Sequence, residues 1–128
     1  MGYAARMRFA PDELALLDES EEIEIETARP DGPAHRTIIW VVADGEDVFI
    51  RSVNGAGARW YREAVARPSI TVHVGGRTIP ARVEPAADDD SIRRTSDQLA
   101  RKYARQRASM RAMLEPHTLE TTLRVVPA

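Results

Sequence analysis

The chain has 128 residues, a length that fits one domain, and we expect residues 1–128 to form a single domain. It contains no cysteine, which excludes disulfide bonds, thiolate metal sites and a cysteine nucleophile. Its 18 basic and 20 acidic residues give a formal net charge of −2, so overall charge favours neither nucleic acid nor an anionic membrane as a partner. No apolar run approaches the roughly 20 residues of a membrane span, and residues 1–8 lack the apolar core of a signal peptide. We therefore expect a cytoplasmic protein.

The first half of the chain predicts one helix followed by three strands. Pro11 and the two acids after it are typical of a helix N-terminus. Residues 22–27 alternate polar and apolar side chains, which is the period of a half-buried strand. Residues 36–42 are β-branched or aromatic and predict a central strand. Asp44-Gly45 is a hairpin signal, and residues 47–52 form the predicted return strand.

The second half predicts two more helices and three more strands. In chain order these are a helix over 59–66, strands over 69–74 and 78–85, a long helix over 88–114 and a last strand over 121–126. In the first of these helices, Trp60 and Ala64 are expected to face the core. Strands joined by hairpins favour an antiparallel arrangement. The predicted fold class is α+β, mainly β: a six-stranded antiparallel sheet or small barrel with three flanking helices.

The usual catalytic and metal-binding patterns are missing. His35, His73 and His117 lie on different predicted elements and lack the spacing of a helical metal-binding pair. The serines lack the glycine-flanked turn of a hydrolase nucleophile. The acidic run 88–90 is better explained as the charge that a helix N-terminus prefers. We therefore predict neither a metal ligand nor a catalytic side chain.

The long helix carries a local basic surface, formed by Arg93, Arg94, Arg101, Lys102, Arg105, Arg107 and Arg111. Such a surface is usually solvated and paired with acids elsewhere in the chain. A protein that binds nucleic acid would interleave exposed aromatic rings with this charge, and only Tyr103 is available. Binding of nucleic acid through this helix is therefore the weaker interpretation.

The stretch 36–68 is the best candidate for a binding site. The glycine-rich segment 54–57 runs into a helix N-terminus, an arrangement that favours anion binding through free backbone N–H groups. Arg36 would add charge-assisted hydrogen bonds, and Trp40 and Trp60 would offer flat apolar surface. The alternative is that the glycines only make the turn, Arg36 forms a salt bridge and the aromatic residues belong to the core. On residue types alone the two interpretations carry equal weight.

Three segments of the chain resemble the split β-barrel flavin and deazaflavin oxidoreductases. These segments are Arg36–Val42, Val48–Ser52 and Trp60–Arg77, and both Ile79–Val83 and Lys102-Tyr103 are also similar to the family. The family includes the pyridoxamine 5′-phosphate oxidase-like proteins and the deazaflavin-dependent nitroreductases. The resemblance covers the chain from about residue 22 onward.

The resemblance implies a six-stranded split barrel that forms a homodimer and transfers hydride through FMN or a deazaflavin coenzyme in a groove at the dimer interface. It implies that Arg36 and Arg59 hold the cofactor phosphate. Polar and backbone contacts would come from Thr37, Ser52, Asn54 and Gly57, while Trp60 and Tyr61 would pack near the ring.

Two features depart from the family pattern and keep other functions open. The family's asparagine and leucine in the helix over 59–66 are here Glu63 and Ala64, and the segment 54–58 has no lysine. The first alternative is a split barrel that binds a cofactor or another ligand without turnover. The second is a structural dimer module without a cofactor. The small-molecule substrate is not identified by the sequence.

Overall fold

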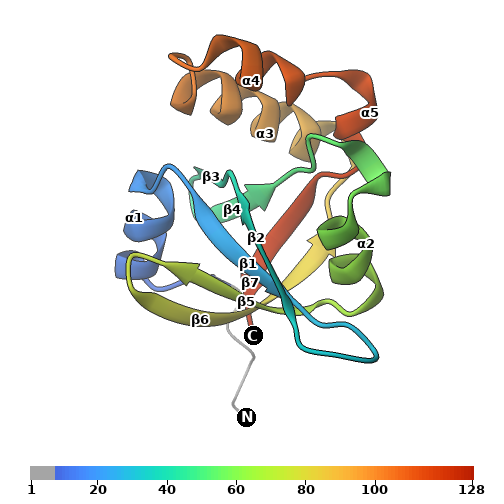
Figure 1. Cartoon of the computed structure of the whole chain (residues 1–128). Helices are drawn as coiled ribbons and strands as arrows, with labels where there is room; N and C mark the ends of the chain where they lie inside the picture. The colour runs from blue at the N-terminus through green and yellow to red at the C-terminus, as the bar shows by residue number, and fades with distance from the viewer. Residues whose placement is uncertain (1–7) are drawn as a thin grey trace.

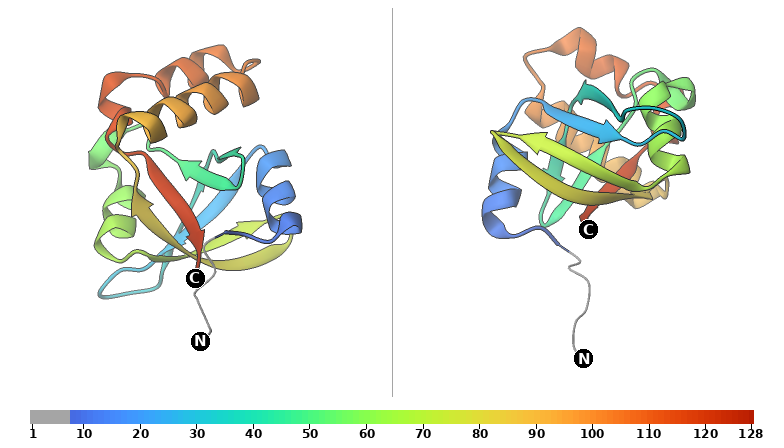
Figure 2. Two further views of the ribbon diagram at one scale, coloured as in Figure 1. Left: turned by 180° about the vertical axis from the view of Figure 1, so that it is seen from behind. Right: turned by 60° about the horizontal axis from the view of Figure 1, so that its bottom comes forward.

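The computed structural model describes residues 8–128; residues 1–7, which make up most of the segment predicted to lack a signal peptide, lie outside the described residues. Its strands are β1 (Ile23–Thr27), β2 (His35–Ile39), β3 (Val42–Asp44), β4 (Asp47–Ile50), β5 (Ser69–Val74), β6 (Arg77–Pro85) and β7 (Leu123–Pro127). Its helices are α1 (Pro11–Glu19), the short 3-10 turn η1 (Gly55–Gly57), α2 (Arg59–Ala66), α3 (Asp89–Lys102), α4 (Arg107–Ala112) and α5 (Pro116–Leu119). Helices α3 to α5 lie over one end of the sheet, and α1 and α2 lie beside it (Figures 1 and 2).

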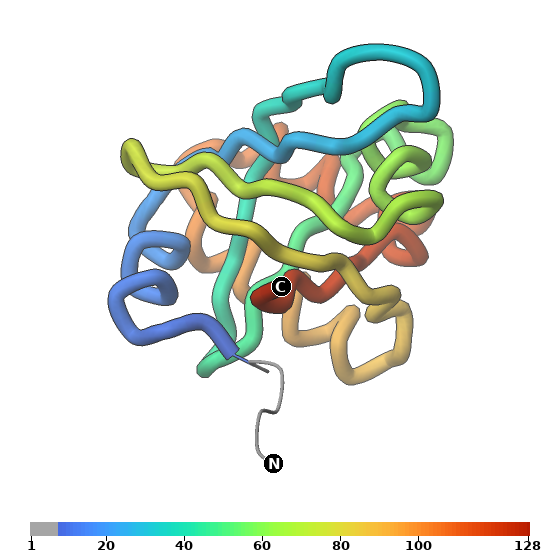
Figure 3. The backbone as a smooth tube through the Cα atoms, turned by 90° about the horizontal axis from the view of Figure 1, so that it is seen from below, coloured from blue at the N-terminus to red at the C-terminus, as the bar shows by residue number. Residues whose placement is uncertain are grey.

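All strand pairs are antiparallel, and the strand order is β2-β1-β5-β6-β7-β4-β3. Strands β2 and β3 are the two edges of the sheet, yet only Trp40 and Val41 separate them in the chain. The sheet must therefore curl until its two edges approach each other, and its strands curve around one interior (Figure 3). This confirms the predicted mainly-β split barrel.

Residues 8–128 form seven strands rather than the six predicted. The predicted strand over 36–42 is two strands, because the chain turns the barrel corner at Trp40 and Val41. Side chains inside the barrel follow the expected alternation: in β6, Ile79, Ala81 and Val83 are buried while their neighbours are exposed. From α2, Trp60 and Ala64 join this core, as predicted.

The end of α3 closes the gap at the barrel corner. The backbone N–H of Val41 donates to Tyr103 Oη (3.3 Å), and the carbonyl oxygen of Val41 accepts a hydrogen bond from Lys102 Nζ (2.7 Å). Tyr103 Oη also lies within hydrogen-bond distance of the carbonyl oxygens of Glu21 (2.7 Å) and Val41 (3.1 Å), and its ring stacks on Trp40 at 3.8 Å. Burial raises the pKa of Tyr103 to about 12, so this hydroxyl stays protonated and can donate.

The predicted helix over 88–114 is interrupted. Helix α3 ends at Lys102 and α4 begins at Arg107, because Tyr103 leaves the helical conformation (φ −110°, ψ 26°) where it reaches the barrel corner. At the other end of α3, the Asp88 carboxylate accepts the N–H of Ser91, which confirms that this acid serves the helix N-terminus.

The basic surface of α3 is partly paired. Arg94 donates to the carboxylates of Asp44 and Asp47, and Arg93 pairs with Asp90. In residues 8–128 no helix is long and apolar enough to cross a membrane. The same part of the chain holds no group of three or more histidine and acidic side chains placed to bind a metal ion.

Candidate functional site

A groove of about 490 Å³ lies where the β2–β3 corner, the turn after β4, α2 and α4 meet. It is lined by Glu22, Thr37, Ile38, Ile39, Trp40, Arg51, Val53, Asn54, Trp60, Gln106, Ser109, Ala112 and Met113. The predicted binding residues Thr37, Asn54 and Trp60 are therefore brought together in one groove. Two further lining residues are exposed large apolar side chains: Ile38 is 62% exposed and Val53 is 42% exposed.

Arg59 is not one of the lining residues; it lines a separate hollow with Glu63 and contacts the groove through Thr37. Its Nη2 donates to the hydroxyl of Thr37 at 3.3 Å, and its Nε lies 3.8 Å from the Glu63 carboxylate one helical turn further along α2. The guanidinium is half exposed, and it bonds to a groove-lining side chain. It can therefore turn toward an anion in the groove at little cost in buried contacts.

Glu63 fixes the position of α2 against the sheet. Its carboxylate accepts the hydroxyl of Thr27 (2.8 Å) and lies 2.7 Å from Nδ1 of His35, so it bonds to both β1 and β2. Partial burial opposes ionisation of this group, but the hydrogen bonds with Thr27 and His35 and the charge of Arg59 outweigh it and lower the pKa of Glu63. The carboxylate of Glu63 thus stays ionised and holds the helix.

The turn between β4 and α2 is held by internal hydrogen bonds. The buried Ser52 donates its hydroxyl to the carbonyl oxygen of Gly55 (2.8 Å), and its backbone N–H donates to Thr121 Oγ1 (2.9 Å). Gly55 has φ +74°, the left-handed region that favours glycine. Ser52 therefore shapes the turn and is not among the groove-lining residues, and Gly57 forms the exposed end of η1.

Tyr61 and Arg36 lie outside the residues that line the groove. Tyr61 packs edge-on against Trp60, with ring centroids 6.1 Å apart, and burial together with the charge of Glu120 raises its pKa. The Arg36 side chain is 54% exposed and pairs with Glu24 (3.1 Å) and Glu26 (3.3 Å) on β1. The salt bridge that the sequence left as an alternative for Arg36 is present.

Arg51 also lines the groove, and the sequence analysis did not single it out. It follows directly after β4 and is only 1% exposed. Its Nε donates to Thr122 Oγ1 (2.9 Å), its Nη1 to Ser96 Oγ (3.0 Å) and the Met113 carbonyl (3.1 Å), and its Nη2 to the Ile92 carbonyl (3.1 Å). The sequence held one signal that could have identified Arg51: an arginine directly after an apolar strand segment, a position where a charged side chain is unusual.

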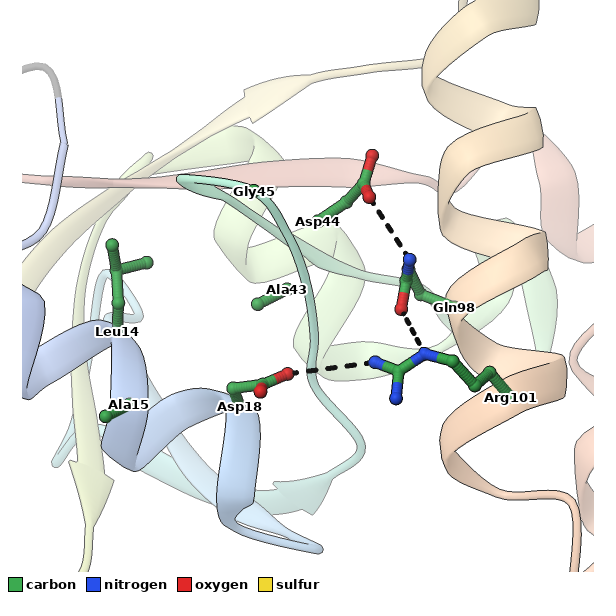
Figure 4. Close-up of a pocket in the computed structure, with 8 residues that line it drawn as sticks. All are labelled: Leu14, Ala15, Asp18, Ala43, Asp44, Gly45, Gln98 and Arg101. Atoms are coloured by element: carbon green, nitrogen blue, oxygen red, sulfur yellow. Dashed lines mark hydrogen bonds and ion pairs between the residues drawn. The ribbon is translucent and has the colours of Figure 1, made fainter.

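A second cavity, of about 400 Å³, lies between α1, the β3–β4 turn and α3 (Figure 4). Its polar side chains bond to one another: Gln98 donates to Asp44 (3.1 Å), Arg101 donates to Gln98 (2.8 Å), and Arg101 lies 4.0 Å from Asp18. These four polar side chains already have partners, so the groove with the two tryptophans is the stronger candidate site.

Solved structures with the same fold include three of chemical interest. A putative pyridoxamine 5′-phosphate oxidase from Listeria innocua has a TM-score of 0.62 and 13% identity; the match covers 91% of this chain and 90% of that one. An F420-H2-dependent reductase (FDR-A) has a TM-score of 0.62 and 13% identity, with 86% of this chain and 96% of that one covered. A FAD-binding protein from Mesorhizobium loti has a TM-score of 0.62 and 17% identity, with 94% and 91% covered.

No curated protein matches the chain. The model of one protein family, "Uncharacterized protein conserved in bacteria (DUF2255)", matches residues 13–125, which is most of the chain. The chain shares its split-barrel fold with these three structures, and it belongs to the DUF2255 family.

Proposed function

We propose that the groove binds a flavin-type cofactor, FMN or a deazaflavin coenzyme, for hydride transfer to a small molecule. The observation that carries this proposal is one groove of about 490 Å³ that combines Trp40 and Trp60 with Thr37 and Asn54, with Arg59 hydrogen-bonded to Thr37. Flat indole surface suits a ring system, and the guanidinium of Arg59 suits a phosphate. The names of two proteins with the same fold, an F420-H2-dependent reductase and a FAD-binding protein, support this choice of ligand.

Each predicted residue has a role in this proposal. Arg59, Thr37, Asn54 and the backbone at Gly57 would hold the phosphate. Arg36 would contact the phosphate only if its salt bridges with Glu24 and Glu26 were broken.

The aromatic residues would serve the ring system. Trp60, which is only 7% exposed, would contact the ring with the part of its indole that lines the groove. Tyr61 would hold Trp60 through their edge-on contact, and Ser52 would keep the turn in shape. The cofactor would supply the redox chemistry, while the protein binds and orients it. No side chain is proposed as an acid or base.

Arg59→Ala is expected to weaken cofactor binding by roughly tenfold to a hundredfold, because a charge-assisted hydrogen bond contributes on the order of 1.5–3 kcal/mol. The full-length chain is titrated with FMN and with a deazaflavin coenzyme while tryptophan fluorescence is followed. Arg77→Ala is the control, since Arg77 pairs with Asp12 away from the groove and its loss should leave affinity unchanged.

Arg36→Ala belongs to the same titration series. The sequence predicts that Arg36 holds phosphate, so its loss would weaken binding as much as the loss of Arg59. Unchanged affinity in Arg36→Ala would show that Arg36 does not hold the phosphate. A parent protein that binds neither cofactor would overturn the proposal in favour of a split barrel that takes another ligand, or a structural dimer module.

We also propose that the chain forms a homodimer through the apolar rim of this groove. Ile38, on the edge strand β2, and Val53 are both exposed there, and an exposed apolar patch of this kind is typical of protein interfaces. Sedimentation at micromolar concentration should give a mass near twice 14.3 kDa.

Two substitutions locate the interface. Ile38→Glu should shift the protein toward the monomer, since it places a charge in an apolar contact. Val65→Glu is the matched control: Val65 is 45% exposed on α2 and does not line the groove. A parent protein that sediments as a monomer would contradict the shared-groove arrangement.

A further inference from the structure

Arg51 is a buried cation without an acidic partner. It is 1% exposed, and no carboxylate of residues 8–128 lies within ion-pair distance of its guanidinium. Its four protein acceptors are two hydroxyl and two backbone carbonyl oxygens, all of them neutral. An arginine has five N–H donors, so one N–H on Nη2 has no acceptor among these residues.

The charge of this group remains in the folded protein. Burial lowers the pKa of Arg51 to about 10, which still leaves the guanidinium protonated at neutral pH. A buried charge is costly unless an opposite charge lies beside it. Hydrogen bonds to neutral oxygens compensate this cost only in part, and the uncompensated charge favours an anion.

The groove is where such an anion can arrive. Arg51 is one of its lining residues, together with Trp40, Trp60 and Asn54. The one acidic side chain that lines the groove, Glu22, is exposed and has no ion pair with Arg51 in the described chain. A ligand in this groove would therefore lie beside Trp40, Trp60 and Arg51, whose buried guanidinium has no acidic partner in the described chain.

We propose that Arg51 is an anion-recognition residue of the groove, in addition to Arg59, and pairs with a phosphate or carboxylate oxygen of the bound ligand. This rests on the proposed function for the location of the site but adds a requirement: the ligand carries an oxyanion in addition to a flat ring. The oxyanion has two sources, the phosphate of the cofactor or the carboxylate of a second, aromatic ligand. The competing explanation is that Arg51 only ties α3, α4 and β7 to β4.

The test compares ligands that differ only in the oxyanion. FMN and riboflavin differ by the phosphate, and 2-naphthoate and 2-naphthamide differ by the carboxylate charge. Each is titrated into the full-length parent protein, Arg51→Met and Arg51→Lys, with tryptophan fluorescence as the readout. Because Arg51 bonds to several elements, each variant is first checked for a cooperative thermal transition. Thr122→Val is the structural control, since it removes one hydrogen bond to Arg51 and keeps the charge.

In the parent protein we expect the charged member of at least one pair to bind tenfold or more tightly than the neutral member. In Arg51→Met this preference should fall to about twofold or less. Arg51→Lys should retain part of it, and Thr122→Val should lower the melting temperature without changing the preference. Loss of the FMN preference alone identifies the cofactor phosphate, and loss of the naphthoate preference alone identifies a carboxylate ligand.

The parent protein alone gives a decisive result if the variants do not fold. A parent that binds each charged and neutral ligand equally overturns the proposal, as does a folded Arg51→Met that keeps the full preference. A parent that binds naphthoate over naphthamide but binds no flavin refutes the proposed cofactor and leaves the role of Arg51 intact.

Discussion

Tyr103→Ala is expected to lower the free energy of unfolding by about 3–5 kcal/mol, and Tyr103→Phe by about 1–3 kcal/mol. The alanine removes the ring that stacks on Trp40 and fills the barrel corner. The phenylalanine keeps that ring but removes the hydroxyl, so the buried N–H of Val41 loses its acceptor and the carbonyl of Glu21 loses a donor. The difference between the two variants separates packing from hydrogen bonding.

The measurement is denaturant unfolding followed by circular dichroism at one fixed protein concentration, because a dimer's stability depends on concentration. Tyr61→Phe is the matched control. The hydroxyl of Tyr61 is half-buried and has no hydrogen bond within residues 8–128, so its loss should change stability by less than about 0.5 kcal/mol. A Tyr103→Phe protein as stable as the parent would show that the barrel corner does not depend on this hydroxyl.

The barrel corner also marks where prediction from the sequence stops. Periodicity located every strand-forming segment, because alternation and β-branched runs are local properties. It merged β2 and β3, since residues 36–42 are continuously apolar and nothing local reveals that the chain changes from one sheet edge to the other at Trp40 and Val41. The helix break at Tyr103 was not predicted for the same reason, because its cause is a contact with Val41, 62 residues earlier in the chain.

The residues of the candidate site show the same difference between local and long-range signals. Asn54 and Trp60 were predictable because a glycine-rich segment leading into a helix is a local pattern, whereas Thr37 was given only by the family resemblance. The pairing of Arg36 depends on strand register, which places it directly opposite Glu26 on β1. Arg51 was not predicted as a site residue because its hydrogen-bond acceptors come from segments 41 to 71 residues away in the chain. When the hydrogen-bond partners of a side chain lie far away in the chain, the local sequence pattern does not predict its role.

Gly55→Val is expected to lower the free energy of unfolding by about 2–5 kcal/mol, the combined cost of backbone strain and steric crowding. Gly55 has φ +74°, which a β-branched residue rarely adopts. A Cβ at this position would lie 3.1 Å from the His117 ring and 3.2 Å from the His117 carbonyl oxygen, so α5 would have to move. The turn that joins Ser52 to α2 would then lose its shape, and ligand affinity at the groove should fall with it.

Gly57→Val separates stability from binding within the same turn. Gly57 is not in the left-handed region, and a Cβ there would have no atom within 4 Å, so stability should change by less than about 1 kcal/mol. If the backbone at Gly57 approaches a phosphate, as proposed, the added side chain should still weaken FMN binding while leaving riboflavin binding unchanged. Equal loss of both ligands would place their common ring, rather than the phosphate, beside Gly57. A Gly55→Val protein that unfolds like the parent would show that the turn relaxes without this glycine and that the shape of the groove does not depend on it.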